Sequence, residues 1–64
     1  MPEIIGYLKD RSGNKYKIEY VYGGLIGANK YRILDSNNRI LIERSSKEKA
    51  VRELESRVGA VYSD

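Results

Sequence analysis

Histidine, cysteine, tryptophan and phenylalanine do not occur among the 64 residues of this chain. Without histidine or cysteine, the usual ligand sets of zinc, haem and iron–sulfur sites are excluded, as are Ser-His and Cys-His nucleophile pairs and disulfides. Carboxylates also lack a spacing suited to acid–base catalysis, because Glu53 and Glu55 diverge on a helix and the aspartates fall in expected turns or at residue 64. We therefore expect a protein that is not an enzyme and that needs no cofactor or metal.

Long apolar runs are missing as well. A stretch of about 18 apolar residues, the minimum for a spanning helix, does not occur, and Met1-Pro2-Glu3 lacks the basic and then apolar layout of a signal peptide. The absence of cysteine fits a reducing compartment. These features predict a cytoplasmic protein with no membrane partner.

The composition that remains is that of one small folded domain, residues 1–64. Isoleucine, leucine and valine make up 16 of the 64 residues, or 25%, above the roughly 20% below which a charged chain stays disordered. A domain of this size without disulfides or metal has a stability of only about 3 to 5 kcal/mol. A homodimer that buries more surface is therefore one alternative to a monomer.

Residue patterning changes along the chain, from period 2 in the first forty or so residues to helical period in the last twenty. This predicts an α+β fold, a four-stranded antiparallel meander followed by one C-terminal helix packed on one face (β-β-β-β-α). The expected strands are residues 3–9, 15–22, 30–34 and 39–43, and the expected helix is residues 46–58. Two turn clusters that each begin with an aspartate, residues 10–14 and 35–38, separate strands one from two and three from four. A strongly bent sheet that closes toward a small barrel is the alternative.

The helix has recognisable ends. Ser45 with Glu48 three residues later has the spacing of a capping box, and Gly59 is the expected stop. Ala50, Val51, Leu54 and Val58 form its apolar stripe. The tail 60–62 is apolar enough either to pack on the helix or to add a short edge strand.

Strand two shows which side chains share a face. Alternation puts Tyr16, Ile18, Tyr20 and Tyr22 on one side of the sheet and Lys15, Lys17, Glu19 and Val21 on the other. In strand four, Ile40 and Ile42 outnumber Leu41, so we expect both isoleucines to face the helix. The two sides of strand one are nearly balanced.

Residues 30–56 combine a hairpin with a helix that begins Ser46-Lys47-Glu48-Lys49-Ala50. This stretch resembles the sheet-plus-helix arm domains of tyrosine integrases, which are similar to plant AP2 domains and read DNA with the sheet. It departs from that pattern in having no aromatic residue just before the helix and no basic cluster on the hairpin. The resemblance implies a DNA-contacting sheet, but no functional residue is carried over from it.

Positive charge is concentrated on the predicted sheet. Residues 1–44 hold eight basic and five acidic side chains, whereas residues 45–64 hold four of each. Residues 7–32 hold six basic side chains, two acidic ones and five of the six tyrosines. Cations displace counterions from phosphates and aromatic rings stack on bases, so we expect nucleic-acid binding through the sheet face or hairpins. The expected phosphate contacts are Lys9, Arg11, Lys15, Lys17, Lys30 and Arg32, and the expected stacking residues are Tyr16, Tyr20 and Tyr22.

The glycine-rich stretch 23–27 matches neither a Walker loop nor a dinucleotide-binding loop, since a strand is predicted after it. It is most simply a connection between strands two and three. Leu25 and Ile26, between glycines, are the basis of the alternative function, a protein-interaction or inhibitor domain that uses this loop or a strand edge. A phage or viral accessory protein of this size fits that alternative.

Overall fold

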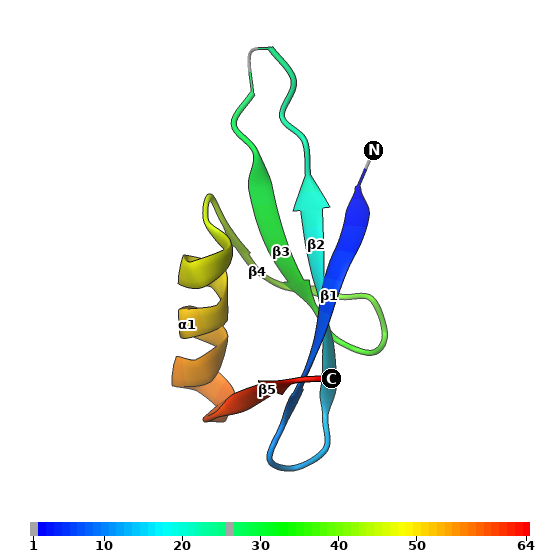
Figure 1. The fold of residues 1–64 in the computed structure, drawn as a ribbon, viewed down its shortest axis with the longest axis vertical. Helices are drawn as coiled ribbons and strands as arrows, with labels where there is room; N and C mark the ends of the chain where they lie inside the picture. The colour runs from blue at the N-terminus through cyan, green and yellow to red at the C-terminus, as the bar shows by residue number, and fades with distance from the viewer. Residues whose placement is uncertain (1, 26) are drawn as a thin grey trace.

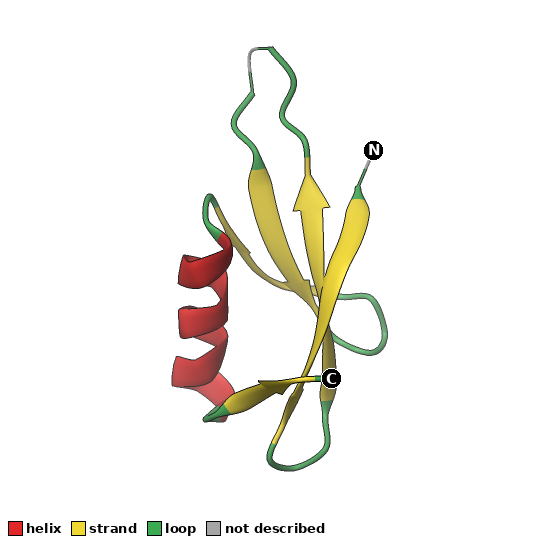
Figure 2. Ribbon diagram, viewed as in Figure 1, coloured by secondary structure: helices red, strands yellow, loops and turns green. Residues whose placement is uncertain are grey.

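The computed structural model describes residues 2–25 and 27–64 (Figure 1). Five strands and one helix follow one another along the chain, with a single helix between the last two strands (Figure 2). Their bounds are β1 Glu3–Asp10, β2 Lys15–Val21, β3 Lys30–Leu34, β4 Ile40–Arg44, α1 Lys47–Val58 and β5 Val61–Ser63. The architecture is α+β, and the first four strands and the helix overlap the ranges expected from the sequence.

The strands form one antiparallel sheet in the order β4-β3-β2-β1-β5. The chain meanders from β1 to β4, crosses one face as α1, and returns as β5 beside β1 (Figure 1). The four-stranded sheet expected from the sequence gains a fifth strand, because the apolar tail forms the short edge strand that was one of its two alternatives and pairs with β1 through Val61↔Asp10 and Tyr62↔Lys9. The strand order has two ends, β4 and β5, so backbone pairing of the described residues leaves the sheet open instead of closing it into a barrel.

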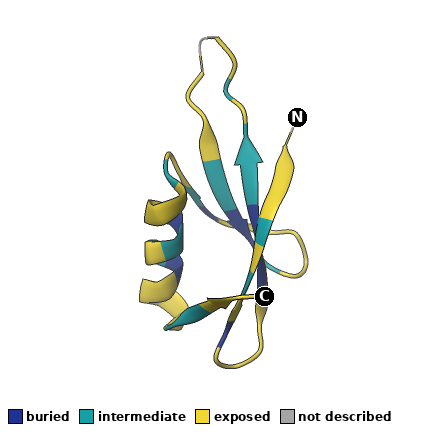
Figure 3. Cartoon of the chain, viewed as in Figure 1, coloured by how far each residue is buried: buried dark blue, intermediate teal, exposed yellow. Residues whose placement is uncertain are grey.

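The core lies between α1 and the sheet face that the helix covers. Ile18, Ile33 and Ile42 are direct neighbours across three strands and are 2%, 0% and 2% exposed. Ala50 and Leu54 cover this row from the helix, and Tyr16 adds to it two residues before Ile18 on β2. The buried positions of α1 and of the sheet face each other (Figure 3). Full burial of each large aliphatic side chain contributes about 1.5 to 3 kcal/mol, so a domain of this size should be sensitive to the truncation of any one of them.

Two irregularities in the register reverse the alternation within β1 and within β4. One lies between Ile4 and Gly6 of β1, and the other separates Ile40 from Ile42 of β4, so that Ile5 and Leu41 are the extra residues. The expectation that Ile40 and Ile42 share a face is therefore wrong. Ile42 is buried against the helix, whereas Ile40 is 54% exposed on the other side.

The helix begins one residue later than expected. Ser46 is the N-cap, with extended backbone, and its carbonyl accepts the first helical hydrogen bond from the Ala50 N–H. Its side chain makes no capping bond, so the expected capping box of Ser45 and Glu48 is not formed. Gly59 does end the helix, because its φ of 85° suits glycine and its N–H donates to the Glu55 carbonyl.

The β1–β2 and β3–β4 turns have the same design. In each, an aspartate carboxylate accepts backbone N–H groups two and four residues on, Ser12 and Asn14 for Asp10 and Asn37 and Arg39 for Asp35. The fourth residue of each turn has a positive φ, 87° at Gly13 and 65° at Asn38. Asp, Gly and Asn are the residues that local turn chemistry favours at these positions, so both turns form where the sequence predicts them.

Candidate nucleic-acid interface

The face of the sheet turned away from α1, called the open face below, carries most of the cations singled out in the sequence. Alternation with the buried residues of β1, β2 and β3 places five of the six there: Lys9, Lys15, Lys17, Lys30 and Arg32. Arg11 lies in the β1–β2 turn, where its Nε donates to the Tyr62 hydroxyl at 3.5 Å. The structure thus brings the cations onto one surface.

The tyrosines expected to stack on bases lie elsewhere. Tyr16 is 6% exposed, and its hydroxyl donates to the Asp10 carboxylate at 2.9 Å, so its ring belongs to the core. Tyr20 packs on Tyr31 with ring centroids 5.2 Å apart. Tyr22 is 61% exposed but follows β2 at the far end of the sheet from Lys9 and Lys15. Alternation along β2, as the sequence predicts, puts Tyr16 and Tyr20 on the helix side, so these two rings do not lie on the surface that carries the lysines.

Two other tyrosines take their place on the open face. Tyr7, 52% exposed, is the cross-strand neighbour of Lys17, and Tyr62, 48% exposed, is the neighbour of Lys9. Lys9 also pairs with Lys15, so one row of the sheet reads Tyr62, Lys9, Lys15 and the next contains Tyr7 and Lys17. We call these five residues the aromatic-basic patch. The two-residue spacing of Tyr7 and Lys9 is a sequence signal for half of it, but Tyr62 joins it only because β5 pairs with β1.

Carboxylates partly neutralise the positive charge of the open face. Asp64 lies 3.9 Å from the Lys9 ammonium and 3.7 Å from that of Lys15. Near the other end, Glu43 accepts a hydrogen bond of 2.6 Å from the Arg32 Nε, which is the main reason that the pKa of Glu43 lies below its ordinary value. Lys30 adds a further cation 3.6 Å from Glu43. Exposed ion pairs of this kind are weak, so a phosphate can replace the carboxylate partner of a lysine.

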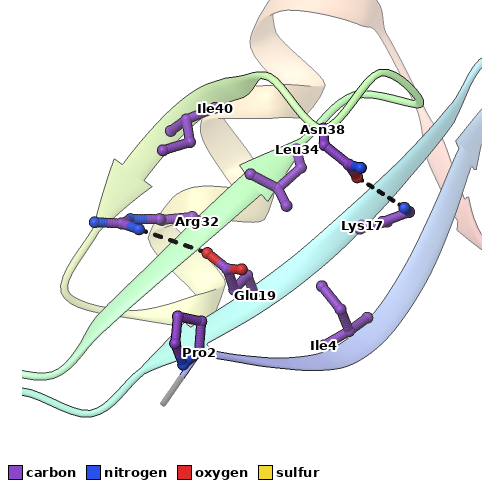
Figure 4. A pocket seen from close by; sticks show the side chains of 8 residues that line it. All are labelled: Pro2, Ile4, Lys17, Glu19, Arg32, Leu34, Asn38 and Ile40. Carbon is purple, nitrogen blue, oxygen red and sulfur yellow. Dashed lines mark hydrogen bonds and ion pairs between the residues drawn. The ribbon is translucent and has the colours of Figure 1, made fainter.

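Between these charged groups lies a hollow of about 530 Å³ on the open face. Figure 4 shows its lining, with the Arg32–Glu19 ion pair on one side, the Lys17–Asn38 hydrogen bond on another and aliphatic side chains between them. We call it the open-face hollow, and its lining residues are Pro2, Ile4, Lys17, Glu19, Arg32, Leu34, Asn38 and Ile40. It shares Lys17 with the aromatic-basic patch, so the two form one continuous surface.

The buried carboxylate of the protein, Asp10, is explained by folding. It accepts hydrogen bonds from Asn14 Nδ2, Tyr16 Oη and two backbone N–H groups. Burial raises its pKa, but these hydrogen bonds together outweigh burial, so the pKa of Asp10 lies below its ordinary value. Burial and the hydrogen bond to Asp10 raise the pKa of the Tyr16 hydroxyl. The hydrogen bonds of Asp10 and Tyr16 thus hold the β1–β2 turn against the core, and together with burial they account for the pKa shifts of both groups.

The β2–β3 loop projects beyond the sheet along the long axis of the molecule (Figure 1). Its backbone closes on itself, because the Gly27 N–H donates to the Gly23 carbonyl at 3.1 Å and the Asn29 side chain accepts the Gly23 N–H. A Cβ on Gly23 would come within 2.3 Å of the Ala28 carbonyl oxygen, so this loop requires glycine there. Leu25 is fully exposed. Ile26, the other residue of the expected apolar tip, lies outside the described residues.

Within residues 2–25 and 27–64, the acidic side chains form no group of three or more suited to hold a metal ion. In the same ranges, no helix has both the length and the apolar character needed to cross a membrane. Comparison of the chain with protein-family models, with curated proteins and with solved structures finds no match. The resemblance of residues 30–56 to integrase arm domains therefore gains no support from these comparisons.

Proposed function

We propose that this protein binds single-stranded nucleic acid through the open face of its sheet. The observation that carries the proposal is the aromatic-basic patch, in which the half-exposed rings of Tyr7 and Tyr62 alternate with Lys9, Lys15 and Lys17. Lysines spaced along such a surface attract successive phosphates, and exposed rings offer faces on which unpaired bases stack. A duplex hides its base faces, so the combination favours a single strand.

The electrostatics favour a contact of moderate strength. Asp64 already occupies Lys9 and Lys15 at 3.9 and 3.7 Å, and a bound phosphate has to displace it. Both lysines are about half exposed or more, so this displacement costs little. Binding that depends on a few lysine–phosphate contacts falls steeply as salt is raised.

Fluorescence anisotropy with labelled DNA and RNA oligonucleotides of about 10 nucleotides tests the proposal, at about 50 mM and about 200 mM salt. We expect affinity that drops with salt, and a further loss of about 5- to 100-fold in Tyr7→Ala, because base stacking on one ring contributes about 1 to 3 kcal/mol. Tyr22→Ala is the matched control, since Tyr22 is even more exposed but lies outside the patch.

Two results would contradict the proposal. The first is no salt-sensitive binding of any oligonucleotide up to tens of micromolar protein. The second is an equal loss of affinity in the Tyr7 and Tyr22 variants, which would mean that the patch is not the contact surface. Self-association in sedimentation experiments, without oligonucleotide binding, would instead support the alternative of a protein-interaction domain and direct attention to Leu25.

A further inference from the structure

We propose that the open-face hollow is a nucleobase subsite that prefers guanine; this inference rests on the proposed binding of single-stranded nucleic acid. The hollow adjoins the aromatic-basic patch through Lys17, whose backbone pairs with that of Tyr7 on one side and Leu34 on the other. A strand stacked on Tyr7 therefore has its next base within reach of the hollow. The patch is indifferent to base identity, whereas the hollow has the chemistry to distinguish bases.

The floor of the hollow suits a flat ring. Leu34 is only 6% exposed, although it points away from the helix-covered core, and Ile4 and Ile40 flank it with 38% and 54% of their surface exposed (Figure 4). Three aliphatic side chains at the base of a hollow of about 530 Å³ leave room for a purine. Covering them with a base removes apolar surface from water, which favours binding.

The acceptor in the wall is Glu19. The Glu19 side chain is 17% exposed, and its carboxylate lies 3.6 Å from Arg32 Nη1, which is beyond ordinary hydrogen-bond length. The close partner of Arg32 is Glu43 instead, at 2.6 Å. Glu19 is thus a largely buried carboxylate whose ion pair with Arg32 is longer than a hydrogen bond, and such an acceptor gains from hydrogen-bond donors on a ligand.

The donor in the wall is Lys17, two residues before Glu19 on the same strand and the same face. Its ammonium donates to the Asn38 side-chain oxygen at 2.8 Å, which holds it at the rim of the hollow. The wall therefore presents a cationic donor followed by an anionic acceptor along β2. A base that fits has an acceptor followed by donors along one edge.

Guanine has this edge, because its O6 acceptor is followed by the N1–H and N2–H donors, and a carboxylate accepts from both donors at once. Cytosine places one amino donor beside acceptors, and thymine or uracil places a single N–H between two carbonyls. Adenine presents the unprotonated N1, which a carboxylate repels. Thymine and uracil match the first two positions of this pattern, because their O4 acceptor is followed by the N3–H donor, whereas the unprotonated N3 of cytosine meets the same repulsion as N1 of adenine. The expected order of affinity is therefore guanine, then thymine or uracil, then cytosine and adenine.

The test uses short oligothymidines that carry one central guanine, inosine, cytosine or adenine, with binding to the unmodified protein followed by anisotropy. We expect the guanine oligonucleotide to bind about 5- to 100-fold more tightly than the adenine one. Inosine lacks the N2 amino group, so it should bind between the two. This series requires no change to the protein and cannot be confounded by misfolding.

Two charge-matched variants then assign the preference to one residue. In Glu19→Gln, removal of a negative charge should tighten binding of plain oligothymidine while the preference for guanine falls to less than about 2-fold. In Asp64→Asn, which loses the same charge on the same face but lies outside the hollow and makes no contact with Arg32, oligothymidine should bind more tightly and the preference should remain. Opposite effects on affinity and selectivity in one variant are not expected from general electrostatics.

Each outcome has one meaning. Equal binding of all four substituted oligonucleotides overturns the guanine subsite while leaving the proposed function intact. A guanine preference that survives in Glu19→Gln overturns the assignment to this hollow. Failure of every oligonucleotide to bind overturns the proposed function and the subsite together.

Discussion

The two faces of the sheet are built from the same strands but differ in how far their side chains are buried. Along β2, Tyr16 and Ile18 are 6% and 2% exposed under the helix, while the intervening Lys17 and the next residue, Glu19, line a hollow on the other side. The covered face gains its stability from contact with α1, so its side chains are constrained by packing. The open face has no such constraint from the helix and can carry charge and exposed rings. Stability and proposed binding are therefore separable by mutation.

The largest difference between the faces is expected from truncation of an aliphatic side chain. Leu54→Ala, at a residue 1% exposed in the core, should destabilise the protein by about 2 to 5 kcal/mol, because it removes buried surface and leaves a cavity. Ile40→Ala on the open face, where Ile40 is 54% exposed, should cost well under half as much. Urea unfolding followed by circular dichroism measures both, and similar midpoints for the two variants would show that the open face packs as tightly as the core.

The next largest effect is expected from the protonation of Asp10, on the helix-covered side of the sheet, at low pH. The pKa of Asp10 is below its ordinary value when folded, so its carboxylate stabilises the fold above the ordinary value of 3.8, and this contribution is lost as pH falls below it. The midpoint temperature of thermal unfolding of the native protein should therefore fall when the pH is lowered below about 4. Asp10→Asn should be less stable than the native protein at pH 7, and the gap should narrow on acidification. A gap that stays constant down to about pH 2 would mean that Asp10 has no special role in the fold.

The smallest effect on stability is expected for Glu43→Gln on the open face. Glu43 also has a lowered pKa, because Arg32 and Lys30 lie beside it, but it is part-exposed and Arg32 retains Glu19 at 3.6 Å. The urea midpoint at pH 7 should hardly change, and any change should shrink as salt is raised from about 50 to about 500 mM. A midpoint shift as large as that of Leu54→Ala would refute the inference that the helix-covered face contributes most of the stability.

Local chemistry explains which features were predictable. Asp10 and Asp35 form their turns with backbone groups two and four residues away, so the information lies within five residues. Alternation along β2 and the glycine stop at residue 59 are local in the same sense. Each of these features was visible in the sequence because its partners are near in the chain.

Several of the features that were mispredicted depend on distant partners. The extra residues Ile5 and Leu41 are irregular only relative to the strands beside them, and they decide that Ile42 is buried while Ile40 is exposed. The same applies to the candidate site. Its cations were identified from composition, but Tyr62 was missed, because it joins Lys9 only through pairing of β5 with β1. Tyr16 and Tyr20, by contrast, lie opposite the lysines through the alternation of β2, which is visible in the sequence.

By itself, the sequence determined the α+β class, the two aspartate turns, the alternation of β2, the apolar stripe of the helix and the concentration of cations on the sheet. The tertiary structure alone decided that a fifth strand pairs with β1, that bulges turn Ile40 outward, and that Tyr7 and Tyr62 are the rings among the lysines. The physical reason is range. Turns and periodicity are set by neighbours along the chain. Strand register, and which side chains lie next to one another on the sheet surface, are set by backbone pairing between segments far apart in sequence.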